Sequence, residues 1–436
     1  MGNTLKEIVR RQKAGEAVGI CSVCSSSAFV IDAALAQAAR WDTDVLIEAT
    51  ANQVNQFGGY TGMKPADFRD WVLAKADRAG LPRGRVILGG DHLGPVAWKG
   101  EPADRAMEKA EELVRAFARA GFTKIHLDCS MPLGDEKTLT TEEIAGRAVH
   151  LALAAEEETA GRKGELPVYV IGSEVPTPGG SGEEDDLQVT RPEDLRAMLD
   201  CFREKFTEAE LDWDRVVAAV VQPGVEFGND SIREYVPEEA RELAEAAREV
   251  PGIVLEGHST DYQTPQSLEA MVRDGIAILK VGPALTFAAR EALFALSDIE
   301  RISLPAKHPE EDIRISGFPE VLDLAMRDNP ANWRNHYKAD EPAAALLRKY
   351  SFSDRSRYYM NEPAVEEAVK RLMGNLRDDP PQLFLLSQFM PAQYERVREG
   401  VLDPDPQELV IDRIRQVLDQ YWQACGLCGQ EKKERP

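Results

Sequence analysis

The chain has 436 residues, of which 43% are hydrophobic and 29% are charged, so it can bury a sizeable core and is not a disordered or low-complexity protein. Its 52 Lys and Arg residues against 75 Asp and Glu residues give a formal net charge of −23. A polyanion such as nucleic acid, or an acidic membrane surface, is therefore repelled on average. Any phosphate group that the protein binds must be held by a local site. With no export signal and no apolar run of membrane-spanning length, we expect a cytoplasmic protein without nucleic-acid or membrane partners.

Short β-branched apolar runs alternate with amphipathic segments over the first 290 residues. We expect eight strands, at 18–24, 44–50, 85–92, 124–130, 168–174, 216–224, 252–259 and 277–284. Helices are expected between them, for example at 27–41, 65–80, 101–121 and 237–250. Eight strand–helix units favour an α/β fold of the closed (β/α)8 TIM-barrel type. A doubly wound sheet is the alternative, and it is weakened because no Gly-rich dinucleotide fingerprint follows the first strand.

After residue 290 the pattern changes to helices without strands. We therefore expect two parts, a barrel at 1–290 and a C-terminal helical extension at 291–436 that packs on the barrel. Two helix starts are also predicted within the barrel. Thr140 and Thr190 are each followed three residues later by a glutamate, the pattern of a capping box.

Polar residues gather at the predicted carboxyl ends of the strands, where the active sites of such barrels lie. In chain order they are Glu48, Gln53, Asp91, His92, His126, Asp128, Glu174, Gln222, Glu256, His258 and Lys280. Burying so many ionisable groups without compensation would cost on the order of several kcal/mol. A shared metal ion or substrate accounts for them.

Two histidines and a glutamate are the predicted ligands of a divalent metal ion. His92 and His258 directly follow apolar strands and share the predicted barrel mouth with Glu174. This ligand set suits zinc, manganese or nickel. His126 is either a further ligand or a hydrogen-bonding partner of one. The histidines elsewhere in the chain are expected to be structural, and these are His150, His308 and His336.

Lys280 and Arg355 each allow two interpretations. A lysine on a barrel strand can form a Schiff base with a ketose, which would make the chemistry metal-free. The accumulated carboxylates and histidines would then have no purpose, so we favour the metal. Arg355 lies in the polar–aromatic segment 353–359 of the extension. Its guanidinium group either contacts a substrate phosphate or forms a structural salt bridge.

Six segments, in this order, carry a resemblance to a known family: IEATANQVNQFGGYTGM, ILGGDHLGP, KIHLDCSM, LEGHSTDYQTP, LKVGPALTFA and SFSDRSRYY. Together they resemble the GatZ/KbaZ-like family, described as the non-catalytic subunit of class II D-tagatose-1,6-bisphosphate aldolase. The resemblance runs from the first strand to beyond residue 390. It implies a TIM barrel and an aldolase catalytic subunit as a partner. Similar proteins are described as D-tagatose (fructose) 4-epimerases that act on free or phosphorylated ketohexoses.

A more distant resemblance to the catalytic class II aldolases holds in part. Their Asp-His pair, an acid and a metal-binding histidine, is matched by Asp91 and His92, and their Asp-Gly-Ser by 128–130. Glu174 and the loop at 179–185 also resemble theirs, which makes Glu184 a candidate loop base. Glu256, however, stands where those enzymes have a histidine. Either the metal site is lost and the protein supports a catalytic partner, or the ligand set is rebuilt. We favour the second, because a supporting subunit has no physical need for charges at so many strand ends.

The resulting hypothesis is a divalent-metal-dependent ketohexose or ketohexose phosphate 4-epimerase. Retro-aldol cleavage between C3 and C4, rotation of the aldehyde and re-formation of the bond would invert C4. The expected catalytic residues are Asp91, Asp128, Glu256 and Glu184. The expected metal ligands are His92, Glu174 and His258, and Glu256 is either a further ligand or a base. The expected substrate-binding residues are Glu48, Gln53, Asn55, His126, Gln222, Lys280 and Arg355. A non-catalytic, aldolase-activating subunit is the alternative, and a homo-oligomer is left open.

Overall fold

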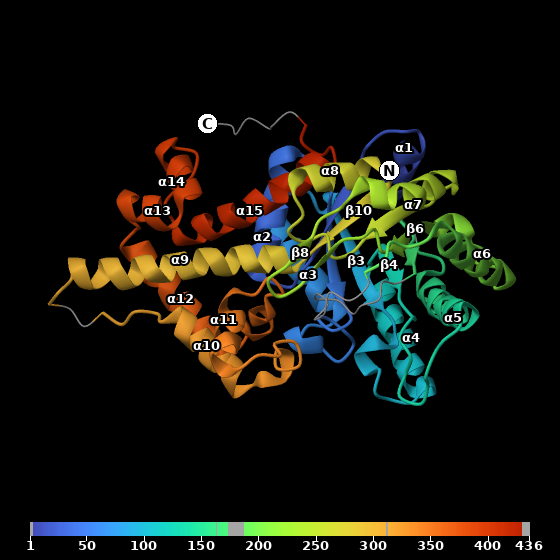
Figure 1. Cartoon of the computed structure of the whole chain (residues 1–436), viewed down its shortest axis with the longest axis horizontal. Helices are drawn as coiled ribbons and strands as arrows, with labels where there is room; N and C mark the ends of the chain where they lie inside the picture. Colours follow the sequence, from blue (N-terminus) through green and yellow to red (C-terminus); the bar gives the residue numbers. More distant parts are fainter. Residues whose placement is uncertain (1–2, 163, 173–186, 311–312, 430–436) are drawn as a thin grey trace.

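The computed structural model describes residues 3–162, 164–172, 187–310 and 313–429. Eight parallel strands close into a barrel, in the order β1, β2, β3, β4, β5, β6, β9 and β10 (Figure 1). Their bounds are β1 Ile20–Cys24, β2 Val45–Thr50, β3 Val86–Leu93, β4 Lys124–Leu127, β5 Val168–Ile171, β6 Val216–Val221, β9 Val254–Gly257 and β10 Ile276–Val281. The predicted TIM barrel is confirmed, and every expected run overlaps one barrel strand.

Each barrel strand is followed by a helix, so the barrel is wrapped by a ring of helices. These helices are α2 Ala28–Trp41, α3 Pro65–Arg78, α4 Ala103–Ala120, α5 Thr141–Thr159, α6 Pro192–Glu208, α7 Pro237–Glu249, α8 Pro265–Arg273 and α9 Pro283–Lys307. Short 3-10 turns complete the connections: η1 Gly59–Thr61, η2 Arg83–Arg85, η3 Pro95–Trp98, η4 Trp213–Arg215, η5 Pro330–Asn332 and η6 Arg355–Tyr359. A small antiparallel pair, β7 Glu226–Phe227 and β8 Ile232–Arg233, lies outside the barrel sheet.

One of the two predicted capping boxes is present. Thr140 caps α5 and exchanges hydrogen bonds with Glu143. The prediction at Thr190 is wrong, because Arg191 is the N-cap of α6 and Pro192 its first residue. The Thr190 hydroxyl instead accepts a hydrogen bond from the backbone N–H of Gln222, and so joins the start of α6 to the end of β6.

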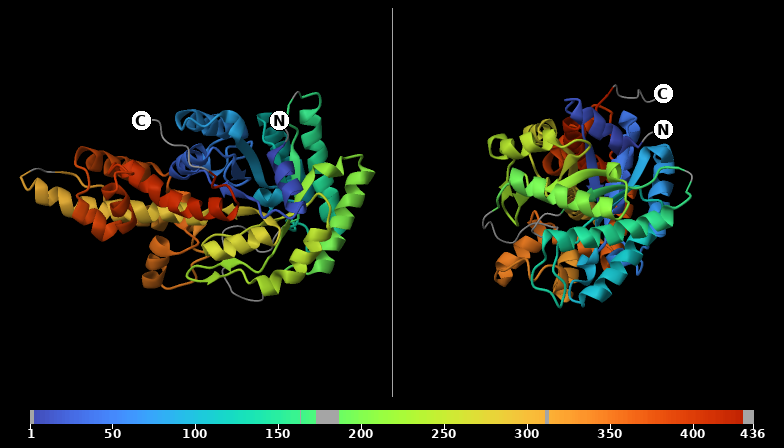
Figure 2. Two further views of the ribbon diagram at one scale, coloured as in Figure 1. Left: turned by 90° about the horizontal axis from the view of Figure 1, so that it is seen from above. Right: turned by 90° about the vertical axis from the view of Figure 1, so that its right-hand side faces the viewer.

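In the C-terminal part, helices joined by loops are found among the described residues, and no strand. Its helices are α10 Phe318–Asp328, α11 Glu341–Tyr350, α12 Pro363–Asp378, α13 Leu383–Phe389, α14 Pro391–Arg398 and α15 Pro406–Ala424. Figures 1 and 2 show α9 projecting past the barrel, with these helices grouped around it. The predicted boundary between the two parts, at residue 290, falls inside α9. This last barrel helix continues into the extension, whose helices α10, α12, α13 and α15 pack against it. The final helix, α15, returns to pack against α9, α2 and α8.

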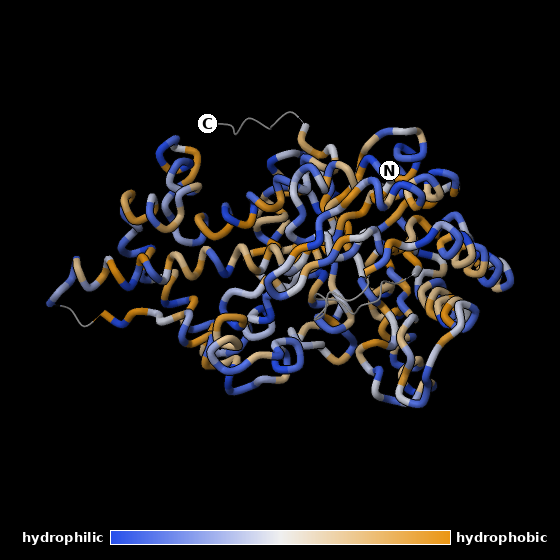
Figure 3. Tube along the Cα trace, in the orientation of Figure 1, coloured by the Kyte–Doolittle hydropathy of each residue, from blue (hydrophilic) through white to orange (hydrophobic). Residues whose placement is uncertain are grey.

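The barrel interior has two layers of different character. Towards the amino ends of the strands it is apolar, and α1 (Thr4–Lys13) covers this end with Leu5, Ile8 and Val9. Towards the carboxyl ends, which we call the mouth, buried charged side chains replace the apolar ones. Hydrophobic residues concentrate along the central strands, whereas the surrounding helices alternate between hydrophobic and hydrophilic positions (Figure 3). No helix in the described part of the chain is both long and apolar enough to cross a membrane.

Candidate functional site

A cavity of about 490 Å³ opens at the mouth of the barrel. We call it the mouth cavity. Residues from the strand ends form its inner wall, and residues from the loops and the extension form its outer wall. The lining residues used below are Gln53, Tyr60, Asp91, His92, Lys99, His258, Lys280, His336, Arg355, Arg357 and Tyr358.

An irregularity in β3 brings Asp91 and His92 to the same place. Neighbours on a regular strand point to opposite faces of the sheet. The pairing of β3 with β4 shifts, however, between Gly90 and Leu93, where β3 has one residue more than its partner. Such a β-bulge re-aims side chains. His92 lies in it with a φ of 47°, in the left-handed region that non-glycine residues seldom adopt, and both side chains therefore line the mouth cavity.

Three imidazole rings and one carboxylate converge at this point. The ring centroids of His92 and His126 are 4.9 Å apart, those of His92 and His258 4.9 Å, and those of His126 and His258 5.4 Å. One ligand atom from each ring and one from Asp91 all lie within 4.8 Å of one another. We call these four residues the histidine cluster. The predicted ligands His92 and His258 are thus brought together, and His126 and Asp91 join them.

Each imidazole of the histidine cluster has one ring nitrogen occupied by an outer partner. The pairs are His92 Nδ1 with Asp128 Oδ2 at 2.7 Å, His126 Nε2 with the Gly172 carbonyl at 2.9 Å, and His258 Nε2 with Glu256 Oε1 at 3.0 Å. The second nitrogen of each ring is the potential ligand atom. In His126 this atom, Nδ1, already accepts a hydrogen bond from the His92 N–H at 3.2 Å and lies 3.0 Å from Asp91 Oδ1, so a metal ion bound to it would replace these contacts. Outer acceptors of this kind orient metal-bound histidines and raise their basicity. The donor set therefore suits a divalent ion such as zinc.

Beneath the histidine cluster lies a network of buried ion pairs. The Lys124 ammonium group is 2.5 Å from a Glu48 oxygen and 2.7 Å from a Glu256 oxygen. Lys280 Nζ is 2.7 Å from the other Glu48 oxygen and 2.5 Å from Asp91 Oδ2. We call Glu48, Lys124, Glu256 and Lys280 the charged layer. Glu48, Asp91 and Glu256 also lie close enough to share a cation, but the two ammonium groups already bridge them.

The buried charges of the site do not balance. Glu48, Asp91, Asp128 and Glu256 carry four negative charges, whereas Lys124 and Lys280 carry two positive ones. Burial lowers the pKa of His258 to about 3, so this ring is neutral at neutral pH. At His126, by contrast, burial is outweighed by the hydrogen bond and the charge of Asp91, which raise the pKa of that imidazole. The four carboxylates outnumber the two lysines by two, a difference that a divalent cation in the histidine cluster would make up.

The pKa values of the two aspartates and the lysine are set by these contacts. Burial alone would raise the pKa of Asp91, but His92 and Lys280 hold it well below its usual value. For Asp128, burial is likewise outweighed by the hydrogen bond with His92, so its pKa is also lowered. Asp91 and Glu48 outweigh burial at Lys280 and raise its pKa well above the usual value. A protonated amine is not a nucleophile, which argues against the Schiff-base alternative.

Two predicted substrate-binding residues, Gln53 and Asn55, differ in their surroundings. Gln53 lines the mouth cavity. Asn55 donates to the Ala51 carbonyl, and its Oδ1 accepts from the N–H groups of Phe57 and Gly59, so its amide holds the loop after β2. Its predicted contact with substrate is not supported by this geometry.

Gln222 is placed similarly, since its Oε1 accepts from two N–H groups of the loop after β6, those of Gly224 and Val225. Glu48 lies in the charged layer, below the cavity wall. The predicted ligand Glu174 and the predicted loop base Glu184 lie outside the described residues.

Several site residues escaped the sequence analysis. Lys124 precedes His126 by two positions, so strand alternation could have identified it as an inward-facing residue. His336 was expected to be structural but lies on the outer wall of the mouth cavity, as do Lys99 and Arg357. The Gly172 carbonyl, the outer partner of His126, has no sequence pattern that would reveal it.

Three solved structures of known proteins are similar to this chain to different degrees. A crystal structure from Sinorhizobium meliloti 1021, described as a probable tagatose 6 phosphate kinase, is 45% identical in sequence. It covers 93% of this chain and 100% of its own, with a TM-score of 0.85. The YdjI aldolase from Escherichia coli K12 is 13% identical, with a TM-score of 0.42 over 86% of this chain and 98% of its own. A fructose-bisphosphate aldolase from Campylobacter jejuni is 14% identical, with a TM-score of 0.43 over 86% and 91%.

A family profile matches almost the entire chain, over residues 5–426. Its description is D-tagatose-1,6-bisphosphate aldolase subunit GatZ/KbaZ-like. This match covers the barrel, the histidine cluster and most of the helical extension, and it relates the chain to aldolase function. The protein therefore belongs to the GatZ/KbaZ-like family of D-tagatose-1,6-bisphosphate aldolase subunits.

Proposed function

We propose that the protein is a divalent-metal-dependent 4-epimerase of ketohexoses or their phosphates, of the tagatose/fructose type. The observation that carries the proposal is the histidine cluster, in which His92, His126 and His258 offer three ring nitrogens to one point beside Asp91. The two carboxylates in excess of the lysines around it would be neutralised by a bound divalent cation. An ion held there would polarise the C2 carbonyl and stabilise the negative charge that develops on cleavage.

Asp91 is the residue best placed to move the proton. It lines the mouth cavity and is held ionised, the form that accepts a proton. As the C3–C4 bond breaks, its electron pair stays on the C1–C3 fragment and the proton of the C4 hydroxyl passes to Asp91. The aldehyde rotates, the bond re-forms on its other face, and Asp91 returns the proton to the C4 oxygen. Lys280, 2.5 Å away, holds the carboxylate in place throughout.

Asp128 and Glu256 are proposed to act through the histidines. Their carboxylates bond the outer nitrogens of His92 and His258, which fixes the ring orientation. This assigns them positioning roles rather than the acid–base roles expected from the sequence. Glu174 as a further ligand and Glu184 as a loop base remain proposals.

The proposal can be tested by measuring metal content and turnover together. We expect the purified protein to contain about one divalent ion per chain and to interconvert tagatose and fructose, or their 6-phosphates, as followed by NMR. Replacing His126 by Ala should remove most of the metal and at least about 100-fold of the turnover. His150→Ala is the matched control, because this histidine is exposed on α5. Metal-free protein that shows no turnover would contradict the proposal.

The family description favours a second candidate, a subunit that supports a separate aldolase. In that case the chain should co-purify with a catalytic aldolase chain and raise its activity, while showing no epimerisation alone. His126→Ala would then leave the stimulation unchanged. A loss of stimulation together with loss of metal would instead assign the histidine cluster to the joint reaction.

A further inference from the structure

The two epimers that the proposed reaction interconverts carry the C4 oxygen on opposite sides of the carbon chain. A carboxylate that lies within hydrogen-bond distance of this oxygen in one epimer faces the C4 hydrogen in the other. Asp91 can therefore take the proton from one epimer, but it needs a second acid–base group to deliver that proton to the other. This group must lie across the sugar from Asp91, within reach of the same carbon.

Tyr358 presents a phenol on the outer wall of the mouth cavity. It lies in η6 and is half-buried. Its hydroxyl accepts a hydrogen bond from Arg357 Nη2 at 3.0 Å. The guanidinium carbons of Arg357 and Arg355 lie 4.5 and 5.8 Å from the centre of its ring. Tyr60, from the loop after β2, packs its own ring edge-on at 5.2 Å. The phenol is thus held both by the extension and by a barrel loop.

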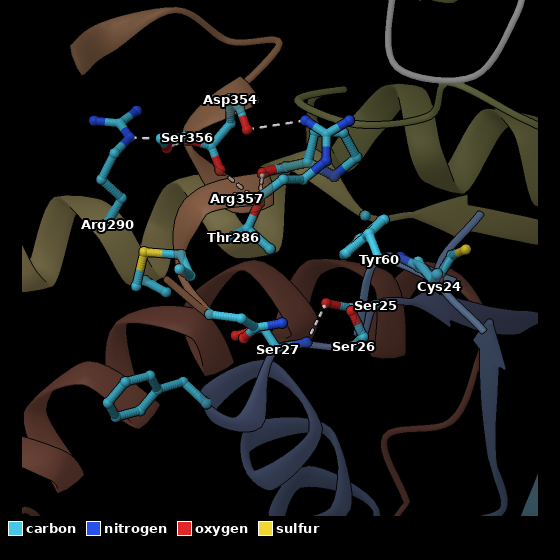
Figure 4. A pocket seen from close by; sticks show the side chains of 17 residues that line it. Cys24, Ser25, Ser26, Ser27, Tyr60, Thr286, Arg290, Asp354, Ser356 and Arg357 are labelled. Atoms are coloured by element: carbon cyan, nitrogen blue, oxygen red, sulfur yellow. Dashed lines mark hydrogen bonds and ion pairs between the residues drawn. The ribbon is translucent and has the colours of Figure 1, made fainter. Parts of the chain in front are cut away.

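The positive charges of Arg355 and Arg357 act on this phenol because no carboxylate pairs with them among the described residues. The nearest carboxylate in sequence, that of Asp354, instead accepts a hydrogen bond from Arg290 Nε on α9 at 2.9 Å (Figure 4). Burial alone would raise the pKa of the Tyr358 phenol. The charges and hydrogen bonds of the two arginines outweigh burial and lower this pKa.

Tyr358 can contact the same sugar as Asp91 because the inner and outer walls of the cavity meet beside Cys24. The Cys24 Sγ lies 3.5 Å from Asp91 Oδ2. Cys24 and Tyr60 line one small pocket of about 60 Å³ and lie side by side in Figure 4, and the ring of Tyr60 contacts that of Tyr358. A ketohexose in the mouth cavity, of about 490 Å³, therefore has Asp91 on its inner side and Tyr358 on its outer side.

Two other titratable groups of the outer wall are less suited to move this proton. Desolvation raises the pKa of Tyr60 to about 12, which makes its hydroxyl a weaker acid than an ordinary phenol. Burial, with the charges of Arg355 and Arg357, lowers the pKa of His336 to about 4, so its protonated form is not populated at neutral pH. A general acid works best when its pKa lies near the operating pH. The lowered pKa of Tyr358 moves it in this direction.

We infer that Tyr358 is the second acid–base group of the 4-epimerase and acts on the C4 oxygen from the side opposite Asp91. This inference rests on the proposed function and adds a catalytic residue to it. Asp91 takes the proton of the C4 hydroxyl as the C3–C4 bond breaks and leaves its electron pair on C3. After the aldehyde has rotated, that pair re-forms the bond to C4, and the carbonyl oxygen takes the proton of Tyr358. The proton held by Asp91 then returns to the phenolate through solvent water, so the enzyme ends as it began.

The first experiment is Tyr358→Phe, which removes the hydroxyl and keeps the ring that packs on Tyr60. Turnover of the ketohexose or ketohexose phosphate, followed by NMR, should show kcat lowered about 10²- to 10⁴-fold and KM changed by less than about threefold. The melting temperature should change little. Tyr350→Phe is the matched control, because Tyr350 is a 58% exposed tyrosine of α11 in the same extension, and it should leave both constants unchanged.

The pH dependence separates a catalytic phenol from a structural one. Ionisation of Tyr358 removes the proton that it delivers, so the wild-type kcat/KM should fall as the pH rises through the pKa of this phenol. In Tyr358→Phe this fall should be absent. A variant with lower kcat and the wild-type pH profile would make Tyr358 a structural residue and overturn the inference. A kcat within about threefold of the wild type would do the same and leave the epimerase standing.

The last measurement needs no turnover and therefore separates this inference from the proposed function. The chain has 10 tyrosines, and the near-ultraviolet absorbance of phenolate counts those that ionise as the pH is raised. In metal-free protein, Tyr358→Phe should lose the phenolate that forms at the lowest pH, whereas Tyr350→Phe should retain it. A wild type without such an early phenolate would overturn the inference. Metal-loaded wild type that does not epimerise would reject the proposed function and, with it, the role of Tyr358 at C4.

Discussion

Three strands of the barrel change from an apolar to a charged interior within two residues. The pairs are Leu46 and Glu48 on β2, Val254 and Glu256 on β9, and Ile278 and Lys280 on β10. Because side chains two positions apart point to the same face of a strand, both members of each pair face the barrel interior. The first members form the apolar floor with α1, and the second members belong to the charged layer.

The two layers differ in what they contribute. Burying apolar side chains stabilises the fold at about 25 cal/mol per Å². Burying an ion pair costs desolvation energy, and the attraction between the charges offsets this cost only when every partner is present. Proteins in which apolar side chains replace a buried ion pair are often equally stable. Stability therefore explains the floor but does not explain why two carboxylates and two lysines lie directly above it. The comparison indicates that the charged layer serves the function of the site rather than the stability of the fold.

The sharpest test of this difference is Lys124→Met. The ammonium group of Lys124 bridges Glu48 and Glu256. Its removal leaves one oxygen of each of these buried carboxylates without a partner, because only the other oxygens contact Lys280 and His258. We expect a loss of about 3–5 kcal/mol in the free energy of unfolding, measured by urea denaturation. Lys137→Met, at an exposed position, should change little. A small change in the free energy of unfolding for Lys124→Met would show that the ion pairs are solvated. The charged layer would then lack the unpaired-charge penalty that distinguishes it from the apolar floor.

Leu46→Ala is the matching change in the floor. Leu46 is fully buried, and its truncation should cost about 2–5 kcal/mol of unfolding free energy, measured in the same way. Metal affinity and kcat/KM should remain within about twofold of the wild type, because the cavity created lies below the charged layer. If Leu46→Ala removed the metal as well, the two layers would have to be treated as one cooperative unit.

The same comparison shows how far sequence reasoning reaches. The strands, their order and the charged residues at their ends follow from local pattern, because alternation and strand ends are local properties. The side chains of Asp91 and His92 reach the same cavity only because of the bulge between Gly90 and Leu93. The bulge is a property of the pairing between β3 and β4, so the sequence of β3 alone does not predict it. The outer wall of the mouth cavity depends on how the extension folds back over the mouth, which brings Lys99 beside residues of the extension over 200 positions away, so Lys99 and His336 were missed.

Asp128→Asn tests whether this carboxylate positions His92 or moves protons itself. Asn keeps the shape of Asp128 but lacks the charge that supports the Nδ1–H of His92. We expect metal affinity to fall by roughly 10- to 100-fold, measured by chelator competition, with little change in melting temperature. Saturating metal should then restore most of the turnover. Unchanged affinity with turnover roughly 10²- to 10⁴-fold lower would restore the acid–base role.

The smallest expected effect concerns Asp261, beside the mouth. Its carboxylate accepts hydrogen bonds from Gly282 and Ala284 at the start of α9, at 3.0 and 2.8 Å. Burial raises its pKa from the usual 3.8 to about 6. Because the pKa of Asp261 is higher in the folded protein than in the unfolded chain, the protonated carboxyl stabilises the fold. This stabilisation is fully present below about pH 4 and is lost as the pH rises through 6.

Asp261→Asn should remove this dependence, because the amide oxygen accepts the same two bonds without a charge. Relative to the wild type, the variant should therefore gain about 1–2 kcal/mol of unfolding free energy between pH 4 and pH 7.5. Urea denaturation of both proteins at several pH values, with a chelator present, measures this difference. A variant that loses stability at pH 7.5 would show that the charge of Asp261 favours the start of α9 more than burial penalises it. The buried charge of Asp261, beside the mouth, would then stabilise the fold, unlike the charges of the charged layer.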